Sequence, residues 1–532
     1  MPKRCFSKCR RIPQDDCVIK NKCYYTNGKT RKFCRLKHTY KMDKECNITR
    51  RLKKGEAPRS PSPSPSPTQR DAPPASAAPA SAVLRQKQAT AREVIARFMR
   101  KTKHKRKSEF FKTICSDSGV CIAFSEKIAA EIKKFFGGFT RFEYAQAPIK
   151  RIGKSSANGF VNEITYSHRG YKSFAVLKSS ASTKADNLMY EYLAGLYVNK
   201  LNKQFSCFLE TYGYYTYNSN AEWTTMKNTQ DIGSTAILKT GLTLHTKPIY
   251  AVACKSSKYL AILIQHLKDI NSMRDMLSSS TPQKAIRAAQ FGQNELLYAL
   301  YQVYMPLATV RHNFTHFDLH GDNVYLYEPV RNQYIQYHYH IGDQVVSFKS
   351  RYMAKIIDYG RSFFKDDDKT DTNSYSKSIY DELCKTAECG KRPYACGYNF
   401  GFGHLTTLAN PADYYFIYAQ KKNISHDLRL IKDITSYYAD MLDEDLKKEL
   451  QKVVYGVGLQ GKINKGYGTI ENFKHGKPVG KIYNVRDAAD ALRALIETPA
   501  QIANNEANYA GLPKMGDLYI YADGRPMRFV KG

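Results

Sequence analysis

Several features that mark other classes of protein are missing from this sequence. No apolar run is long enough to span a bilayer, and the N-terminus, MPKRCFSKCRR, lacks the apolar segment of a secretory signal peptide. We therefore expect no membrane span and a reducing compartment. Acidic residues are also scarce, since 48 Asp and Glu stand against 83 Lys and Arg, which gives a formal net charge of +35.

The excess of positive charge is concentrated at the N-terminus. Residues 1–110 contain 30 Lys and Arg against 8 Asp and Glu, a net charge of +22, and the other 422 residues carry only +13. Clustered positive charge attracts polyanions. We predict that residues 1–110 bind nucleic acid or another anionic surface.

The N-terminal cysteines include no C-x₂-C pair, the spacing most typical of zinc sites. Six of the 13 cysteines nevertheless lie in the first 46 residues, a segment too short to bury a core of its own. In a reducing compartment Zn²⁺ is favoured, with Cys17, Cys23, Cys34 and His38 as candidate ligands. Packaging into oxidised particles would favour disulfides instead. The seven cysteines from Cys115 onward are scattered, and we interpret them as core or loop thiols.

The segment after the cysteines is poor in apolar residues. Residues 51–108 contain Ser-Pro repeats, an Ala/Pro-rich run and a basic tract at 100–107. We expect a disordered linker whose repeats act as a spacer or as acceptor sites for proline-directed kinases. The basic tract resembles nuclear-import and nucleic-acid-binding sequences, and a solvated basic face is its alternative.

The most informative motifs are THFDLHGDNVYLY and AKIIDYG. The first holds Asp318 and Asn323 at the spacing H-x-D-L-x-x-x-N, and the second ends with Asp358 in a D-Y-G that corresponds to D-F-G. Phosphoryl transfer needs a carboxylate near the acceptor hydroxyl and oxygen ligands for Mg²⁺. We predict that Asp318 is the base and that Asn323 and Asp358 bind Mg²⁺ in a protein of kinase fold.

The first motif contains a second candidate base. The tripeptide H-G-D that ends at Asp322 is typical of small-molecule phosphotransferases. If Asp322 were the base, asparagine would be needed at position 327, which is Tyr327. The register with Asp318 and Asn323 is therefore favoured.

Upstream segments match the nucleotide half of such a site. The strand FAVLK places Lys178 to contact the α- and β-phosphates and Val176 to cover the adenine. The next helical segment carries Glu191, either the ion-pair partner of that lysine or a solvated helix-face residue. The apolar strand YLAILIQHL ends with Gln265 and His266 near the expected adenine edge, unless it is simply a core strand.

A phosphate-covering loop is expected in IGKSSANGFV. Its candidate contacts are Gly153, Ser156, Gly159 and Val161. The match is irregular, because serine replaces the middle glycine and Gly153 is one residue out of register. Clusters of Gly, Ser and Asn are also ordinary turns.

One more polar residue is expected beside the base. Asp427 opens an apolar helical segment, HDLRLI. Its carboxylate either bonds to the backbone of the loop that carries Asp318 or caps the helix.

The chain departs from protein kinases in several places. Residues 336–350 predict an extra hairpin with a turn at Gly342 and Asp343. Phe317 precedes the predicted base where kinases carry arginine, so activation by loop phosphorylation is not expected. No A-P-E follows, and His320 is more like aminoglycoside and choline phosphotransferases, so peptide recognition stays open.

Four segments together carry a family resemblance: FTHFDLHGDNVYLYEP, SFKSRYMAKIIDYGRSFF, DSGVCIAF and LPKMGDLYIYADGRP. They resemble segments of the serine/threonine kinase-like proteins of nucleocytoplasmic large DNA viruses, the giant viruses, over roughly residue 117 to the C-terminus. The resemblance implies ATP and Mg²⁺ dependence and production in an infected host cell. It also implies location in the host cytoplasm or the virion, and the basic tract at 100–107 adds the nucleus as a further candidate.

The expected fold is α+β, with the two lobes of a protein-kinase-like protein. The expected parts are a Cys-rich basic module (1–50), a linker (51–108), an N-terminal segment with the small lobe (109–267), the large lobe (268–495) and a C-terminal tail (496–532). The expected function is ATP-dependent phosphoryl transfer to a hydroxyl, with protein Ser/Thr favoured by analogy. The alternatives are a small-molecule phosphotransferase and a non-catalytic scaffold that binds nucleic acid or virion components.

Overall fold

The computed structural model describes twelve parts of the chain. They are residues 23–27, 32–36, 40–42, 48–50, 115, 120–121, 126–153, 159–180, 188–246, 259–365, 422–454 and 480–532. The chain divides into two compact units, Met1–Glu93 and Val94–Gly532. None of the described helices is long and apolar enough to cross a membrane.

The first unit contains two small antiparallel hairpins. They pair β1 (Cys23–Asn27) with β2 (Lys32–Leu36), and β3 (Tyr40–Met42) with β4 (Ile48–Arg50). Two of the candidate zinc ligands lie on these strands, Cys23 on β1 and Cys34 on β2. The other two, Cys17 and His38, lie outside the described residues, so the zinc hypothesis stays a prediction.

The second unit mixes helices and sheets, as the α+β prediction requires. Its largest sheet is antiparallel, in the order β10-β8-β11-β7-β6-β5-β9. The strands are β5 (Ala145–Ile152), β6 (Gly159–His168), β7 (Tyr171–Ser180), β8 (Thr211–Tyr217), β9 (Asp231–Ile232), β10 (Leu242–His245) and β11 (Leu260–His266). The helices of this region are α3 (Glu126–Phe135), α4 (Leu188–Leu201), α5 (Asn220–Asn228) and α6 (Ala236–Thr240).

Side-chain alternation gives this sheet two different faces. Ala175 and Leu177 of β7 join Leu263 of β11 in one buried apolar cluster. Val176 and Lys178 alternate with Ala175 and Leu177 along the strand and therefore project from the other face. Strand β7 thus carries the two predicted nucleotide contacts on a single face of the sheet.

The tight turn between β6 and β7 explains why glycine stands at position 170. Arg169 and Gly170 connect the strands with positive φ values of 49° and 83°. Two-residue hairpin turns of this handedness match the twist of the strands and favour glycine. The sequence therefore fixes the register that places Lys178 opposite Val161.

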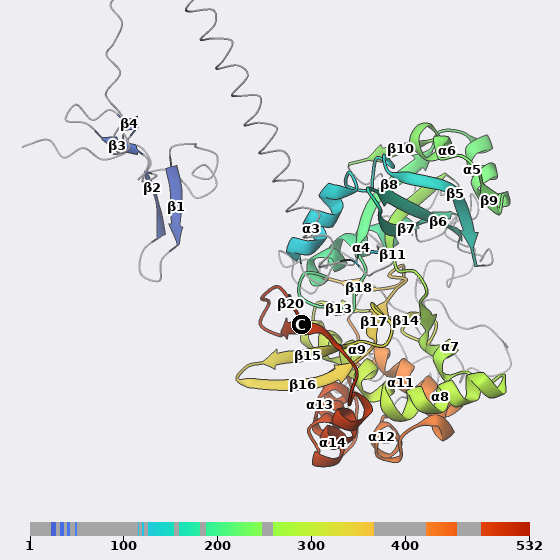
Figure 1. The fold of residues 1–532 in the computed structure, drawn as a ribbon, viewed down its shortest axis with the longest axis vertical. Coiled ribbons are helices and arrows are strands. Elements are labelled where there is room, and N and C mark those ends of the chain that lie inside the picture. Colours follow the sequence, from blue (N-terminus) through green and yellow to red (C-terminus); the bar gives the residue numbers. More distant parts are fainter. Residues whose placement is uncertain are drawn as a thin grey trace, which may run out of the picture. The chain divides into compact units, whose positions relative to one another are not determined.

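The rest of the second unit is mainly helical. Figure 1 shows the large sheet at one end of this unit and α8, α9, α12 and α13 at the other. The helices are α7 (Met273–Leu277), α8 (Pro282–Asn294), α9 (Leu296–Val310), η6 (His426–Leu428), α11 (Arg429–Tyr437), η7 (Ala439–Met441), α12 (Glu444–Leu450), α13 (Val485–Ile496) and α14 (Pro499–Asn508). Helix α9 is apolar on nearly every side and is buried over almost its whole length.

Short strands connect the helices to the loops that carry the motifs. One small sheet has the order β12-β14-β17, and another pairs β13 with β18. Their strands are β12 (Asn271–Ser272), β13 (Phe314–Thr315), β14 (Val324–Tyr327), β17 (Met353–Ile356) and β18 (Phe363–Phe364). Pairing of β14 with β17 brings the strand after Asn323 beside the strand before Asp358.

A four-stranded sheet contains the predicted extra hairpin. Its order is β16-β15-β19-β20, with bounds β15 (Tyr334–Ile341), β16 (Gln344–Ser350), β19 (Lys514–Tyr521) and β20 (Arg528–Lys531). The hairpin is confirmed, and Gly342 turns it with a φ of 61°. The segment 496–532, which we expected to be a tail, is folded: it forms α14, and β19 pairs in parallel with β15.

The described cysteines correct one prediction. Cys115 and Cys121 form a disulfide, so their interpretation as separate thiols is wrong. The backbone N–H of Cys121 donates to Lys172 O at 2.9 Å, which joins the disulfide to the start of β7. Cys207 is a buried free thiol, as predicted.

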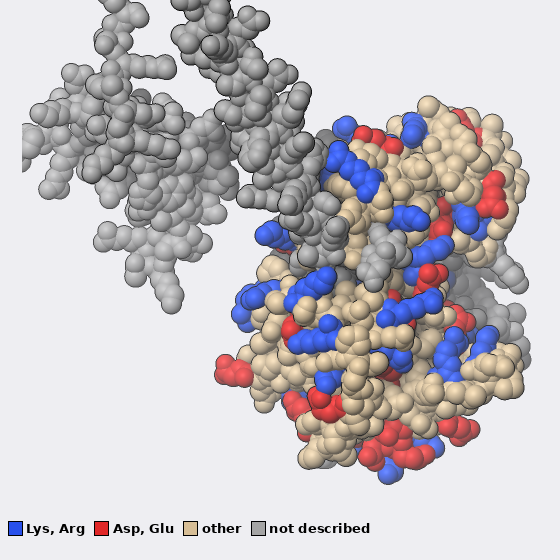
Figure 2. All heavy atoms as spheres, viewed as in Figure 1, with Lys and Arg blue, Asp and Glu red and all other residues tan. Residues whose placement is uncertain are grey.

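Charge is distributed unevenly on the second unit. Figure 2 shows lysine and arginine side chains across much of the visible face, whereas acidic side chains gather at its lower end, over α12. The first turn of α12 carries Glu444 and Asp445. Acidic groups there stabilise the positive end of the helix dipole.

Candidate functional site

A lysine and two carboxylates from distant segments meet at the centre of the candidate site. Lys178 Nζ on β7 lies 2.6 Å from Glu191 Oε2 on α4 and 3.1 Å from Asp358 Oδ1 after β17. Burial alone would lower the pKa of Lys178, but the charges of Asp358 and Glu191 outweigh it and raise the pKa. Lys178 is therefore a fixed cation with the ion-pair partner that the sequence predicts.

The D-Y-G turn holds its aspartate toward that lysine. Asp358 has a φ of 65°, and the aromatic residue after it is anchored, since Tyr359 Oη donates to Ile356 O and accepts from Leu209 N. A Cβ on Gly360 would lie 3.4 Å from Glu191 Oε2. Glycine thus leaves room for the ion pair. Burial raises the pKa of Asp358, yet Lys178 overcomes it and lowers that pKa to about 2.

The predicted base, Asp318, is held by two arginines. Arg361 Nη1 donates to Oδ2 at 3.0 Å, and Arg429 Nη1 donates to Oδ1 at 2.8 Å. Burial opposes ionisation of the carboxyl, but these two positive charges hold its pKa below the ordinary value. Asp318 is therefore a carboxylate with a fixed orientation. Neither arginine's role could be predicted from the sequence, because the contacts arise only when the loops of Asp318 and Arg361 pack against the start of α11.

Asn323 folds back onto the loop that carries Asp318, the predicted base. Its Nδ2 donates to Asp318 O at 2.9 Å and lies 3.2 Å from His320 Nε2. The amide oxygen, Oδ1, has no partner among the described residues and keeps its capacity as a metal ligand. The N–H of Ile357 donates to Asn323 O at 3.0 Å, which ties the two motif loops together.

The expected group behind the base is present. Asp427 is buried, and its carboxylate accepts from the N–H of His316 at 2.8 Å and of Phe317 at 2.9 Å. The hydrogen bonds to the loop backbone are confirmed, and the helix-cap alternative is wrong, because Leu428 caps α11. The bonds hold Phe317 at a φ of 64°, a conformation that L residues rarely adopt.

The rejected alternative base has a different partner. Asp322 Oδ2 lies 3.0 Å from Arg274 Nε, at the start of α7. Its side chain is half exposed, whereas the Asp318 side chain is mostly buried. The two carboxylates of the motif therefore lie in different surroundings, and only Asp318 shares the loop core with Asn323.

The predicted phosphate-covering residues lie along β5 and β6. Gly153 follows β5 with a φ of 67°, and no atom of the described residues lies within 4 Å of the place where its Cβ would be. Gly159 begins β6, where a Cβ would lie 2.4 Å from Ser179 O. Val161 pairs with Lys178 across the strands. Ser156 lies outside the described residues.

The two residues predicted at the adenine edge have different positions. His266 of β11 projects from the same face of the sheet as Lys178 of β7. Its Nε2 lies 3.1 Å from Glu163 Oε2. Gln265 projects from the opposite face and accepts a hydrogen bond from the N–H of Glu210 at 3.3 Å. The structure therefore brings His266 toward the site and does not bring the side chain of Gln265.

A charged residue that the sequence did not single out lies on the same face. Glu163 of β6 is buried and accepts from Lys268 Nζ at 2.8 Å as well as from His266. The hydrogen bond from His266 lowers the pKa of Glu163 to about 2, with help from Lys268 and against burial. Strand alternation could have identified Glu163, because it pairs with Val176.

Comparison with known proteins finds no family model that matches the chain and no curated protein that matches it. The chemistry must therefore be argued from the site itself. Within the described ranges, no group of three or more His, Cys, Asp and Glu is arranged to hold a metal ion. Asn323 and Asp358 offer two protein oxygens, and Mg²⁺ in phosphoryl-transfer sites takes its other ligands from phosphate and water.

Proposed function

We propose that this chain is an ATP-dependent phosphotransferase of the two-lobed protein-kinase-like fold, which transfers the γ-phosphoryl group to a hydroxyl acceptor. The observation that carries the proposal is Lys178 held between Glu191 and Asp358. Such a lysine, fixed by one carboxylate and adjacent to a second that can bind metal, is what positioning of a nucleoside triphosphate requires. The resemblance to the kinase-like proteins of giant viruses supports the same activity.

Each part of the site has a distinct role in this proposal. Lys178 binds the α- and β-phosphates, and Glu191 positions the lysine. Asn323 and Asp358 would hold Mg²⁺, which would supply positive charge to neutralise the phosphates. Val176 and Val161 lie on the Lys178 face, where they would cover the base.

Asp318 would orient the acceptor hydroxyl and accept its proton. Each carboxylate oxygen has two lone pairs, so an oxygen already bonded to arginine retains one for the hydroxyl. The arginines make Asp318 a weak base, so its main contribution is orientation. A weak base is compatible with the loose transition state of phosphoryl transfer, in which the acceptor hydroxyl loses little of its proton before the phosphoryl group moves.

The acceptor class rests on the resemblance, which favours protein Ser or Thr. The small-molecule alternative draws on His320, which lies 3.7 Å from Asp318 Oδ1. Burial lowers the pKa of His320 to about 4, so its ring is neutral at pH 7. A panel of protein acceptors against metabolite alcohols, assayed with the same enzyme, separates the two classes.

The decisive experiment measures Mg²⁺-dependent transfer from labelled ATP, with Asp318→Asn beside Asp322→Asn. The two substitutions make the same chemical change in one motif. We expect Asp318→Asn to lower turnover by about 10²-fold or more and Asp322→Asn to retain it within a few-fold. A larger loss of turnover in Asp322→Asn than in Asp318→Asn would instead identify Asp322, the aspartate of the H-G-D tripeptide, as the base.

A third variant and a binding measurement complete the test. Lys178→Met should weaken ATP binding and abolish transfer, because the lysine contacts the phosphates. Folded wild-type protein that neither transfers phosphate nor shows a thermal shift with ATP would contradict the proposal. The scaffold alternative would then stand, with residues 1–110 as the functional part.

A further inference from the structure

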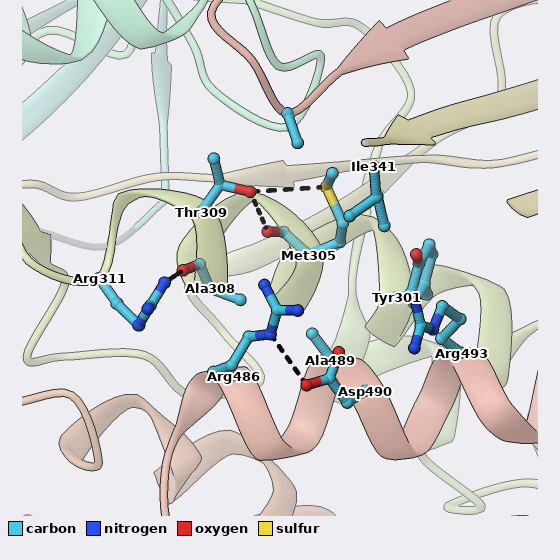
Figure 3. A pocket seen from close by; sticks show the side chains of 11 residues that line it. Tyr301, Met305, Ala308, Thr309, Arg311, Ile341, Arg486, Ala489, Asp490 and Arg493 are labelled. Atoms are coloured by element: carbon cyan, nitrogen blue, oxygen red, sulfur yellow. Dashed lines mark hydrogen bonds and ion pairs between the residues drawn. The ribbon is translucent and has the colours of Figure 1, made fainter. Parts of the chain in front are cut away.

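A cavity of about 170 Å³ lies in the helical region, apart from the site described above. Its walls come from the C-terminal half of α9, one face of α13, the end of β15 and the residue after β19 (Figure 3). The lining residues that bear on its chemistry are Tyr301, Met305, Arg311, Arg486, Asp490 and Arg493. None of them belongs to the candidate phosphotransferase site.

Two buried donors in this cavity lack partners. The hydroxyl of Tyr301, a residue with 0% exposure, has no hydrogen-bond partner in the described part of the chain. Arg493 Nε is buried and also has none there. Buried polar groups are nearly always bonded, and exceptions are common at ligand sites. Two such exceptions in the wall of a single cavity therefore indicate an occupant that accepts hydrogen bonds.

The charges of the cavity select an anion. Arg311, Arg486 and Arg493 line it, and Asp490 is the one acid among the lining residues. Each guanidinium has five donors, and its hydrogen bonds to the described residues use few of them. Arg486 Nε binds Asp490 at 2.8 Å, Arg493 Nη1 donates to Gln344, and Arg311 Nη1 donates to Ala308 O.

The backbone carbonyls at the C-terminal end of α9 do not cancel the positive charge of the three arginines. Thr309 Oγ1 donates to Met305 O at 3.0 Å, and Arg311 donates to Ala308 O at 2.8 Å, so the carbonyls near the cavity already have donors. Figure 3 shows these bonds at the cavity wall. Burial and the nearby acids Asp490 and Glu497 raise the pKa of Tyr301, so its hydroxyl remains a donor.

We propose that this cavity binds a small phosphate-bearing molecule. Donors from Tyr301, Arg486 and Arg493 approach from two helices, which suits a tetrahedral anion with several acceptor oxygens. Met305, Ile341 and the lining alanines provide an apolar wall for a compact organic group. A cavity of about 150 Å³ holds a benzene-sized molecule, so the volume fits a phosphate ester of a few carbons.

The test is calorimetric titration of the full-length chain with inorganic phosphate and with glycerol 3-phosphate. Residues 1–110 also attract anions, so the measured quantity is the difference between wild type and Tyr301→Phe, which leaves that region unchanged. We expect Tyr301→Phe to weaken binding about tenfold, because a hydrogen bond to a charged oxygen is lost. Arg486→Gln, at the half-exposed rim, should weaken it by a similar factor.

Matched variants separate the cavity from general charge effects. Arg141→Gln removes one exposed arginine far from the cavity in sequence and should leave both affinities unchanged. Asp490→Asn removes the acid that competes for Arg486 and should tighten binding. A melting temperature of Tyr301→Phe at or above that of wild type shows that weaker binding is not caused by unfolding.

The outcomes decide both the site and its ligand. Tighter binding of glycerol 3-phosphate than of phosphate, lost together in Tyr301→Phe, assigns a small phosphate ester. Equal binding of the two, lost in the same variant, assigns inorganic phosphate. Affinities unchanged in both Tyr301→Phe and Arg486→Gln overturn the proposal, whatever the phosphotransferase assay shows.

Discussion

At the scale of single residues, the two arginines that bind Asp318 lead to a prediction about how the rate of phosphate transfer depends on pH. Because Arg361 holds the pKa of Asp318 down, Arg361→Gln should raise that pKa. A base must be deprotonated, so the acid limb of the kcat/KM profile should move to higher pH in this variant. The profile of phosphate transfer, measured from pH 3 to pH 8 so that it includes the wild-type acid limb, checks it.

The same motif supplies the control for this pH prediction. Arg274→Gln also removes an arginine from an aspartate, but its partner is Asp322. The acid limb should stay where it is in wild type. An equal shift in both variants would mean that the limb does not report Asp318.

A buried lysine gives a second prediction at this scale, independent of the proposed function. Lys355 is 4% exposed, and its Nζ donates to Ser206 O with no carboxylate within ion-pair distance among the described residues. Burial lowers its pKa to about 8, against the opposing effect of Cys207. Below that pKa the folded protein must hold a buried charge, and the cost disappears as pH rises toward the unfolded value near 10.5.

Lys355→Met should therefore stabilise the protein at pH 7 by about 1–3 kcal/mol, since methionine fills the space without a charge. Urea unfolding at pH 7 and at pH 10 measures this, and the gain should shrink at the higher pH. Lys284→Met, an exposed lysine of α8, is the control and should change stability by less than about 0.5 kcal/mol. A loss of stability in Lys355→Met would mean that the lysine stabilises the fold through its hydrogen bond.

At the scale of elements, the sequence predicted those features that depend on local pattern. Alternating side chains and a Gly-Asp turn predicted the hairpin of β15 and β16, and motif spacing placed Asp318, Asn323 and Asp358 in loops that the structure brings together. Local pattern holds no information about which distant strand pairs with which. The parallel pairing of β19 with β15 was missed for that reason, and the segment 496–532 was interpreted as a tail.

The direction of the Gln265 side chain was missed, although it could have been predicted from the alternation of side chains along the strands. Lys178 and Val176 share a face of β7, and pairing with β11 extends the same parity to Ile264 and His266. Gln265 must then project from the opposite face, because strand side chains alternate. The arginines at Asp318 are different, since Arg361, in a loop, and Arg429, at the start of α11, reach it only through tertiary packing.

The close pairing of β6 and β7 supports a prediction at this scale. A Cβ at position 159 would lie 2.4 Å from Ser179 O, so Gly159→Ala must push the strands apart. We expect a loss of about 1–3 kcal/mol in urea unfolding. Gly233→Ala is the control, because in the described part of the chain no atom lies within 4 Å of its Cβ position. It should be neutral or slightly stabilising, and equal effects of the two variants would contradict the contact argument.

At the scale of the whole molecule, the charge of the chain and its proposed chemistry belong to different parts. Lys178, Glu191 and Asp358 all lie beyond residue 110, whereas residues 1–110 carry +22 of the net charge of +35. Affinity for nucleic acid that depends on Lys and Arg falls steeply with salt, because each phosphate contact releases a counterion. Removal of residues 1–110 should therefore abolish salt-sensitive binding and leave ATP binding intact.

The measurement is fluorescence anisotropy of labelled DNA and RNA at several salt concentrations, for the full chain and for residues 111–532. The full chain should show a steep slope of log K against log salt, with one contact for roughly each unit of slope. The shorter chain should show little binding at any salt but the same thermal shift with ATP. If it kept both affinity and slope, the nucleic-acid surface would have to lie on the second unit, where lysine and arginine are spread over the visible face (Figure 2). The two activities would then share one unit, and phosphate transfer should become sensitive to added DNA or RNA.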